Sequence, residues 1–221
     1  GFLLGPRVNA GGRIGAADLG ARLLATADPR EAADLAERLD RLNSERREIE
    51  NRVRDEALAQ AEARGTDGPL VWAAAEGWHP GVVGIVASRV VERYGRPAFL
   101  IALDGDVGKG SGRSISRFDL HAALHQCGDL LERFGGHHMA AGLTIRRQHL
   151  DAFRERFAGV ARATLGADDL GPEQRVDLVL ELGAVTPELE RLCRYLEPCG
   201  MGNPTPVFGA RGVHFEGVRK V

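Results

Sequence analysis

Residues 69–103 decide the fold, and they read PLVWAAAEGWHPGVVGIVASRVVERYGRPAFLIAL. The apolar run at 70–75 has the length and composition of a buried strand. Pro80 then opens a segment whose valines and Ile85 recur on one helical face, and Tyr94-Gly95 ends it. A second apolar run follows at 98–103. Strands separated by a helix predict the α/β class, with a mixed sheet covered by helices.

The same alternation continues toward residue 165. The glycine-rich stretch 109–115 predicts a third strand, and residues 143–145 predict a fourth. Between them, Asp119 starts a predicted helix that carries four leucines and is stopped by Gly135. A last helix, predicted from His149, buries the apolar side chains Leu150, Phe153, Phe157 and Val160.

A long helix is predicted ahead of this domain. Residues 1–27 indicate a loop broken by Pro6 and glycines, followed by a short helix. Asp28 can then cap a helix with Pro29 at its first position and Glu31 three residues after the cap. This helix runs to Arg64 and closes at Gly65. Its apolar stripe, interrupted by Arg46, fits a coiled-coil seam or a helix that joins two domains, and we favour the second.

The remaining residues predict the start of a β domain. Residues 167–172 are a polar linker, residues 177–182 alternate like a strand, and residues 187–196 form a short helix. A turn-rich connection with glycines and prolines leads into strand-like residues at 207–221. A lone hairpin is not stable by itself, so this part is interpreted as an unfinished β domain.

Composition excludes several classes of protein. The chain is 43% hydrophobic and 27% charged, which is typical of a globular protein, and no run of 18 apolar residues predicts a membrane span. The three cysteines show no CxxC spacing, so we expect free thiols in a reducing cytoplasm. The formal net charge is −2, so a nucleic-acid partner requires a local basic surface. Lys109 and Lys220 are the only lysines among the 29 basic residues, which a compositional bias of the source genome explains as well as phosphate binding does.

Three glycine-rich clusters, at 5–13, 108–114 and 135–142, are the candidates for chemistry. Glycine lets backbone amides approach a ligand, and nearby guanidinium and hydroxyl groups suit phosphate. Each cluster alone fits ordinary turn chemistry, whereas three together favour a phosphate-binding function. The candidate phosphate-binding residues are Asn9, Arg13, Ser111, Arg113, Ser114, Gly135 and Gly136.

His137 and His138 could bind a metal or donate to a phosphate. Adjacent side chains on an extended segment point to opposite sides, and no Asp, Glu or Cys with ligand spacing surrounds them. A structural role in a turn is the third interpretation. His79, beside Trp78 and Pro80, is interpreted as a packing residue, and no nucleophile triad is visible.

Several motifs resemble a known family. Gly-Ser-Gly-Arg-Ser at 110–114 and Phe-Gly-Gly-His-His-Met-Ala-Ala-Gly at 134–142 resemble the DHH-associated domain of the DHH phosphoesterase superfamily. The segments 5–13, 77–89 and 197–208 are similar to the RecJ exonucleases of that superfamily. The resemblance implies a DHH-domain tail at 1–27, a linker helix at 28–65, a substrate-binding domain at 69–165 and a truncated OB-like domain at 172–221.

The resemblance also implies an activity. RecJ exonucleases degrade single-stranded DNA from 5′ to 3′ with Mn²⁺ or Mg²⁺, in recombination and repair. The metal ligands of the family lie in a DHH motif that this sequence lacks, so we expect no metal bound to this chain and no hydrolysis by it alone. The family motif Gly-Gly-His-x-x-Ala-Ala-Gly places the catalytic histidine at His137. The implied partners are single-stranded DNA, a single-strand-binding protein and a recombination helicase.

Two other functions remain open from the sequence. One is a DHH phosphodiesterase that acts on short oligoribonucleotides or cyclic dinucleotides. The other is a non-catalytic nucleic-acid-binding relative.

Overall fold

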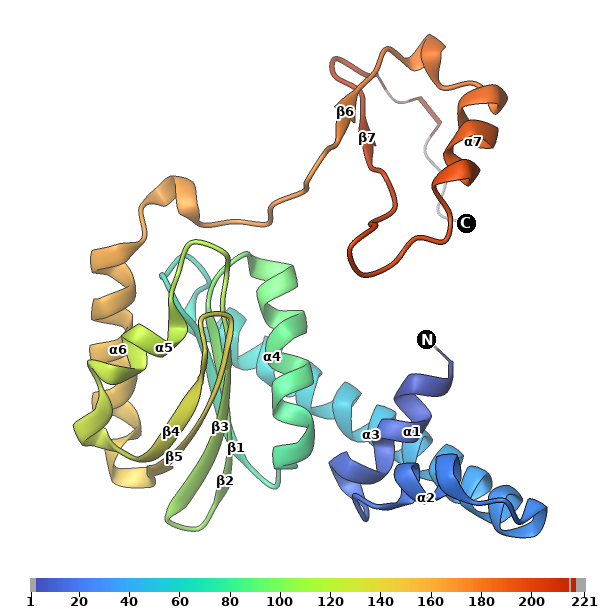
Figure 1. The fold of residues 1–221 in the computed structure, drawn as a ribbon. Coiled ribbons are helices and arrows are strands. Elements are labelled where there is room, and N and C mark those ends of the chain that lie inside the picture. The colour runs from blue at the N-terminus through green and yellow to red at the C-terminus, as the bar shows by residue number, and fades with distance from the viewer. Residues whose placement is uncertain (1–2, 215, 218–221) are drawn as a thin grey trace. The chain divides into compact units, whose positions relative to one another are not determined.

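The computed structural model describes residues 3–214, 216 and 217. The chain divides into two compact units, Gly1–Pro172 and Glu173–Val221. The first unit contains a five-stranded sheet and its helices, and the second contains short elements only (Figure 1). Within the described residues, no helix combines the length and the apolar character that crossing a membrane requires.

The sheet of the first unit is mixed, as the sequence predicts. Its strand order is β1-β2-β3-β5-β4. β1 and β2 are parallel and are joined by α4, whereas the other neighbouring pairs are antiparallel. The strands are β1 (Val71–Glu76), β2 (Ala98–Asp104), β3 (Val107–Arg113), β4 (Leu131–His137) and β5 (Ala140–Arg146).

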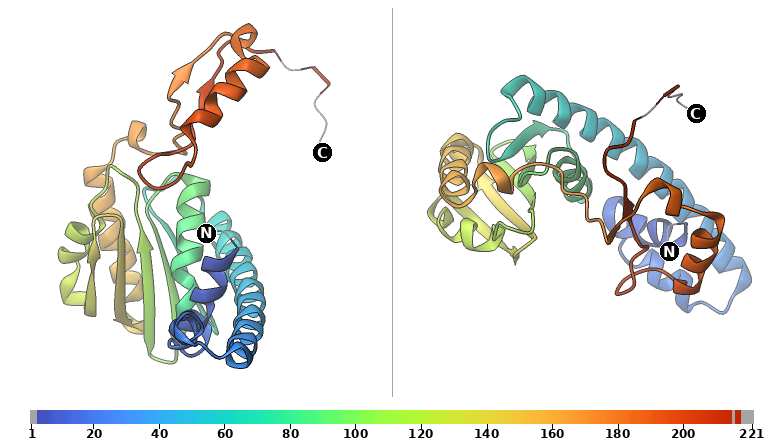
Figure 2. Two further views of the ribbon diagram at one scale, coloured as in Figure 1. Left: turned by 45° about the vertical axis from the view of Figure 1, so that its right-hand side comes forward. Right: turned by 90° about the horizontal axis from the view of Figure 1, so that it is seen from above.

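Helices cover the two faces of the sheet unequally (Figures 1 and 2). α4 (Pro80–Tyr94) packs its valines on one face, against β2 and β3, and α3 packs behind it. On the other face, α6 (Leu150–Thr164) buries Phe153 and Phe157 against Phe99. The α4 side of β5 and β4 carries exposed residues such as Gly135 and Gly142 and remains an open face.

The long helix is confirmed and joins two groups of elements. α3 spans Pro29–Arg64, and the Asp28 side chain accepts a hydrogen bond from the Arg30 amide at 2.8 Å. One end of α3 packs Leu35 and Leu39 on α1 and α2, and the other end packs on α4 and β1. Glu31 does not complete a capping box, because its carboxylate instead binds Arg22 and Thr26.

The expected loop at the start of the chain is a helix. α1 spans Leu4–Ile14, and α2 spans Leu19–Ala25. Pro6 lies in the first turn of α1, where its missing amide hydrogen costs no helical hydrogen bond. Gly11 is buried, and a Cβ there would lie 3.3 Å from both Leu19 Cβ and Leu39 Cδ2. Glycine therefore lets α1 pack closely on α2 and α3 rather than breaking the chain.

The predicted helix from Asp119 to Gly135 is wrong in its second half. α5 covers only Leu120–His125, a 3₁₀ turn follows at Gly128–Leu130, and residues Leu131–His137 form β4. Leu131 and Phe134 face the apolar core from β4, since they pair with Ile145 and Leu143 of β5. Their spacing mimics a helical face only because a β-bulge lies between Leu131 and Arg133.

The second unit holds a small sheet and one short helix. β6 pairs with β7 in parallel, and α7 lies between them in sequence. The predicted strand at 177–182 shortens to two residues, and in the predicted strand at 207–221 only two residues pair, while 215 and 218–221 lie outside the described residues. The elements are β6 (Leu178–Val179), α7 (Pro187–Cys193) and β7 (Phe208–Gly209), with 3₁₀ turns at Leu182–Ala184 and Arg194–Leu196.

Candidate nucleic-acid interface

Glycine at every second position gives β3 two different faces. Gly108, Gly110 and Gly112 point into the core, where added Cβ atoms would lie 2.7 Å from Ile101, 2.8 Å from Leu143 and 2.4 Å from Phe99. These glycines therefore serve packing, and the cluster forms the third strand that the sequence predicts rather than a turn. The intervening residues Lys109, Ser111 and Arg113 face the α4 side, because successive side chains of a strand alternate.

Arg113 lies between β3 and α4. Its Nη1 donates to Ser111 Oγ at 2.9 Å and to the Gly112 carbonyl at 2.7 Å. The guanidinium fits beside Gly84 of α4, where an added Cβ would lie 2.9 Å from Arg113 Nη2. Burial, with a smaller contribution from the nearby charge of Arg13, lowers the pKa of Arg113. Burial thus disfavours the charged guanidinium, and an anion beside it would favour that form.

Arg13 reaches the same place from the last turn of α1. Its Nη1 donates to the Gly81 carbonyl of α4 at 3.2 Å. A Cβ on Gly81 would lie 2.0 Å from the Arg13 carbonyl oxygen, so only glycine permits this approach of α1 to α4. None of the ion pairs between described residues includes Arg13 or Arg113. The two predicted arginines are therefore close enough for their like charges to interact, and neither forms an ion pair with a described carboxylate.

The sheet register brings His137 to the same face. Arg113 pairs with Ala140 of β5, and Ala140 pairs with His137 of β4. Paired residues of antiparallel strands share a face, so Arg113 and His137 lie on the same side of the sheet, about 10 Å or two strand spacings apart. Arg113 lies beneath α4, and His137 lies on the open part of this face. The neighbouring row of paired residues on this side of the sheet consists of small residues, because Ser111 pairs with Gly142, which pairs with Gly135.

His138 does not share this position. It lies with Met139 in the two-residue turn between β4 and β5. Its carbonyl oxygen accepts a hydrogen bond from the Leu120 amide at 3.0 Å, which ties the turn to α5. The Ala122 amide, and to a smaller extent the charge of nearby His138, lower the pKa of Asp119 at the start of α5.

Two other predicted residues have structural environments. Ser114 is buried, and its hydroxyl donates to the Phe118 carbonyl at 2.7 Å, so the structure does not bring that hydroxyl to Arg113. Gly136 has φ +149°, and a Cβ there would lie 2.3 Å from the Ala140 carbonyl oxygen. Backbone geometry alone thus requires Gly136, whereas Gly135 has open space above it.

A cleft of about 710 Å³ between α1, α3 and α4 adjoins Arg13. We call it the arginine cleft. Asn9 and Arg13 line it from α1, and the sequence analysis missed most of its other side chains, although it noticed Arg46 as a break in the apolar stripe. The further lining residues are Gly5, Pro6, Arg46, Arg47, Glu50, Asn51, Arg54, Ile85 and Arg89.

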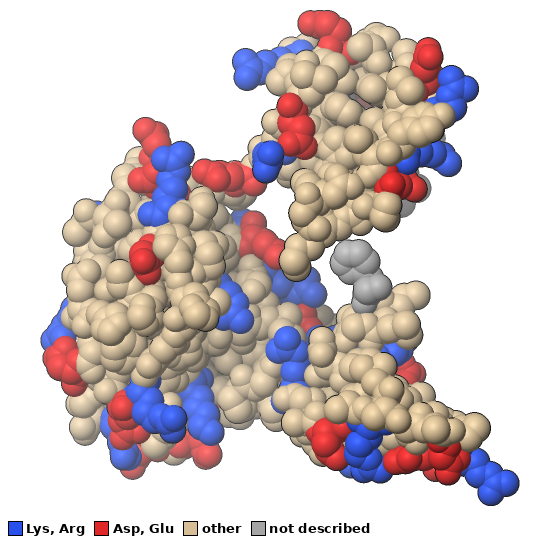
Figure 3. Space-filling model, viewed as in Figure 1, with Lys and Arg blue, Asp and Glu red and all other residues tan. Residues whose placement is uncertain are grey.

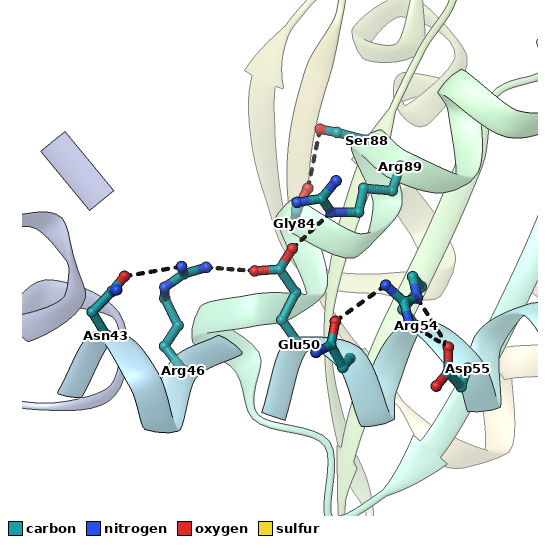
Figure 4. A network of polar contacts seen from close by, with 9 residues as sticks. Asn43, Arg46, Glu50, Arg54, Asp55, Gly84, Ser88 and Arg89 are labelled. Atoms are coloured by element: carbon teal, nitrogen blue, oxygen red, sulfur yellow. Dashed lines mark hydrogen bonds and ion pairs between the residues drawn. The ribbon is translucent and has the colours of Figure 1, made fainter. Parts of the chain in front are cut away.

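A network centred on Glu50 organises the arginine cleft (Figure 4). The Glu50 carboxylate accepts from Arg46 of its own helix and from Arg89 Nε of α4 at 2.7 Å. Arg46 also donates to Asn43 Oδ1 at 3.1 Å. Arg46 and Glu50 are 8% and 5% exposed, so this is a buried pair. Figure 3 shows basic side chains, with acidic ones among them, in the hollow between the sheet and the lobe of α1 and α2.

Metal binding finds no support in this part of the protein. Among residues 3–214, 216 and 217, no three His, Cys, Asp or Glu side chains are grouped as metal ligands. The resemblance implies Mn²⁺ or Mg²⁺ ligands in a DHH motif that this sequence lacks, so no reaction step is assigned here to a metal.

Comparison with known proteins agrees with the motifs. A family model of the DHHA1 domain matches residues 67–163, and one of the RecJ OB domain matches residues 176–221. The chain is 43% identical to a single-stranded-DNA-specific exonuclease RecJ of Bacillus subtilis over its whole length, and 41% identical over 94% of its length to that of Escherichia coli. It spans only 28% and 38% of these two relatives.

A solved structure shows the same fold. A crystal structure of RecJ from Thermus thermophilus in complex with Mn²⁺ matches 94% of the chain with a TM-score of 0.82 and 37% identity, and the match covers 30% of that protein. A structure of the same protein with Mg²⁺ matches equally well, with a TM-score of 0.82.

Proposed function

This chain belongs to the RecJ family, whose DHHA1 and OB regions it contains, and from that premise we propose that it is the substrate-binding part of a longer exonuclease. The proposed enzyme hydrolyses the phosphodiester bonds of single-stranded DNA from the 5′ end, in recombination and repair. The match of residues 176–221 to a RecJ OB domain supports single-stranded DNA over short oligoribonucleotides or cyclic dinucleotides, since OB folds bind single strands.

One observation carries this proposal: Arg113 and His137 lie on the same face of the sheet, and Arg113 lies near Arg13 without an ion pair to any described carboxylate. A guanidinium presents a fork of donors that matches phosphate oxygens. Ser111, already held by Arg113, adds a hydroxyl at the same point. In the proposal these groups bind the 5′-terminal phosphate of the strand.

His137 is the proposed catalytic residue of this chain. From β4 its imidazole can donate a proton or a hydrogen bond to a phosphate oxygen as negative charge grows there. The small residues Gly135, Gly142 and Ala140 leave space on the open face for the DNA strand to approach.

The test compares the two adjacent histidines in the longer enzyme. His137→Ala should lower the single-turnover rate on 5′-phosphorylated single-stranded DNA by about 10²–10³-fold, as loss of one preorganised donor does. His138→Ala should stay within about tenfold of the parent, because its side chain lies in the turn. Circular dichroism checks that both variants fold. The reverse ranking would show that the catalytic histidine is His138.

A second test concerns the phosphate-binding arginine. Arg113→Ala should weaken binding of a 5′-phosphorylated strand and abolish the preference over a 5′-hydroxyl strand, with a salt slope lower by about 0.7 for the one lost contact. Arg156→Ala is the control, since it removes the same charge from α6, on the opposite face, where Arg156 pairs with Asp129. Equal affinities for the two variants would argue against the Arg113 site.

We also propose that the 221-residue chain does not hydrolyse DNA alone, since its sequence contains no Asp-His-His motif. A nuclease assay with Mn²⁺ on 5′-phosphorylated single-stranded DNA tests this. Metal-dependent turnover that co-purifies with the chain through several columns would contradict it.

A further inference from the structure

The arginine cleft is a second basic site, distinct from Arg113. Five arginines line it, from α1, α3 and α4, against one lining carboxylate, that of Glu50. This concentration of positive charge is local, because the whole chain carries a formal charge of −2. Arg13 lines the cleft and also lies close to Arg113, so the two basic sites adjoin.

The arginines of the cleft differ in how far they are neutralised. Arg54 binds Asp55 and Asn51, and it is therefore engaged within α3. The side chain of Arg47 forms no hydrogen bond or ion pair with any described residue. Arg89 uses only its Nε, toward Glu50, so that among the described contacts its two Nη groups stay available. Arg47 and Arg89 thus offer unpaired donors from two different helices.

Arg46 supplies an independent sign that an acceptor belongs here. Its side chain is almost fully buried, lines the cleft, and has a buried Nε without any hydrogen-bond partner. Buried donors without acceptors are rare in folded proteins, and each one calls for an explanation. An anion in the cleft would provide the acceptor.

Glu50 fixes the geometry of these donors. One carboxylate held by Arg46 of α3 and Arg89 of α4 restrains both side chains, because each loses rotational freedom in a fixed ion pair. Preorganised donors bind an anion with less loss of conformational entropy than free side chains do. The network in Figure 4 therefore has the construction of a binding site and not of a random basic surface.

We propose that the arginine cleft binds an internal backbone phosphate of the same nucleic-acid strand whose terminal phosphate lies at Arg113. The identity of that strand as single-stranded DNA rests on the proposed function. The chemistry is that of a phosphodiester monoanion on Arg47 and Arg89, with Arg46 and Arg13 beside them. A second point of attachment would hold the strand in one direction along α4.

The experiment measures binding of the 221-residue chain to a fluorescein-labelled dodecathymidylate, with a 5′ phosphate or a 5′ hydroxyl, by fluorescence anisotropy across a salt series. Arg47→Ala, Arg89→Ala and the double variant are compared with Arg52→Ala. Arg52 is exposed on α3 and lies outside the cleft, so its variant is matched in charge and helix. Thermal melts by circular dichroism check folding, and Arg47→Ala removes no hydrogen bond or ion pair between described residues.

We expect the double variant to bind both oligonucleotides about tenfold more weakly, with a salt slope lower by about 0.7 per lost contact, and Arg52→Ala to stay within about twofold. The preference for a 5′ phosphate should be retained. If the parent lacks that preference while the cleft variants still bind more weakly than the parent, the proposed function would be overturned and the proposed phosphate site in the cleft would be retained. Three results would overturn the second phosphate site. The cleft variants could bind like Arg52→Ala, they could lose the preference for a 5′ phosphate, or the parent could bind neither oligonucleotide.

Discussion

Replacing Glu50 with Gln should destabilise the first unit strongly while changing hardly any volume. The change removes the carboxylate charge that holds Arg46, whose side chain is 10% exposed. Breaking a buried ion pair from one side costs about 3–5 kcal/mol, because the other charge stays buried without compensation. The contact with Arg89 adds little, since that side chain is 54% exposed and well screened. Since Arg46 borders an open cleft, we expect the lower end, about 3 kcal/mol.

Tryptophan fluorescence can measure this loss in the first unit alone. The chain has two tryptophans, Trp72 and Trp78, and both are buried in the sheet-containing unit. Urea unfolding followed at these residues gives the free energy of unfolding, and the melting temperature should fall by roughly 6–12 °C. Glu48→Gln, an exposed change on the same helix, should stay within about 0.5 kcal/mol of the parent.

A double variant separates charge pairing from packing. Replacing Arg46 and Glu50 together with Met removes both buried charges, and it should cost less than Glu50→Gln alone, because a buried pair is often no more stable than apolar residues of similar volume. A Glu50→Gln variant that is as stable as Glu48→Gln, or a double variant that costs more than Glu50→Gln, would refute the reasoning.

Three other changes test particular features of the structure. Gly136→Ala should destabilise the chain by about 1–3 kcal/mol in thermal melts, because φ is +149°, whereas Gly135→Ala should leave stability within about 0.5 kcal/mol and weaken strand binding. Burial raises the pKa of Cys127 to about 11 from 9.0, so the unfolded thiol ionises first and stability should fall as pH rises from about 9 to 11; iodoacetamide at pH 8 should label it only after unfolding. Gln60 bonds both backbone groups of Ala74 on the outer strand β1, so Gln60→Ala should cost about 1–2 kcal/mol and speed hydrogen exchange of the Ala74 amide.

Local signals in the sequence were sufficient where one segment determines its own structure. Asp28 with Pro29, and Pro80 with Gly95, mark the bounds of α3 and α4 because capping and helix-starting preferences act within one turn. The same local reasoning failed for β4, where Leu131 and Phe134 are spaced three apart, as on a helix, but lie on either side of a bulge in a strand. It failed for α1 as well, because Gly11 lacks a side chain where Leu39 of another helix packs against α1.

The candidate site depends on long-range pairing that local patterns do not contain. Arg113 and His137 came from separate motifs, and only the β3–β5–β4 register places them on one face. The resemblance to RecJ exonucleases selected both residues without their spatial relation. The pair of Glu50 with Arg89 joins positions 39 residues apart on two helices, so neither residue stands out in its own segment.

The glycines of α4 explain how the two basic sites come to adjoin. Glycine inside a helix costs about 1 kcal/mol relative to alanine, so from sequence Gly81 and Gly84 look like weaknesses in α4. In the structure, Gly81 admits the backbone of Arg13, and Gly84 admits the guanidinium of Arg113. A methyl group at either position would push one arginine away from the other, since the added Cβ would lie 2.0 Å from the Arg13 carbonyl oxygen or 2.9 Å from Arg113 Nη2. The two glycines of α4 therefore set the geometry of the proposed phosphate-binding site as directly as the arginines themselves do.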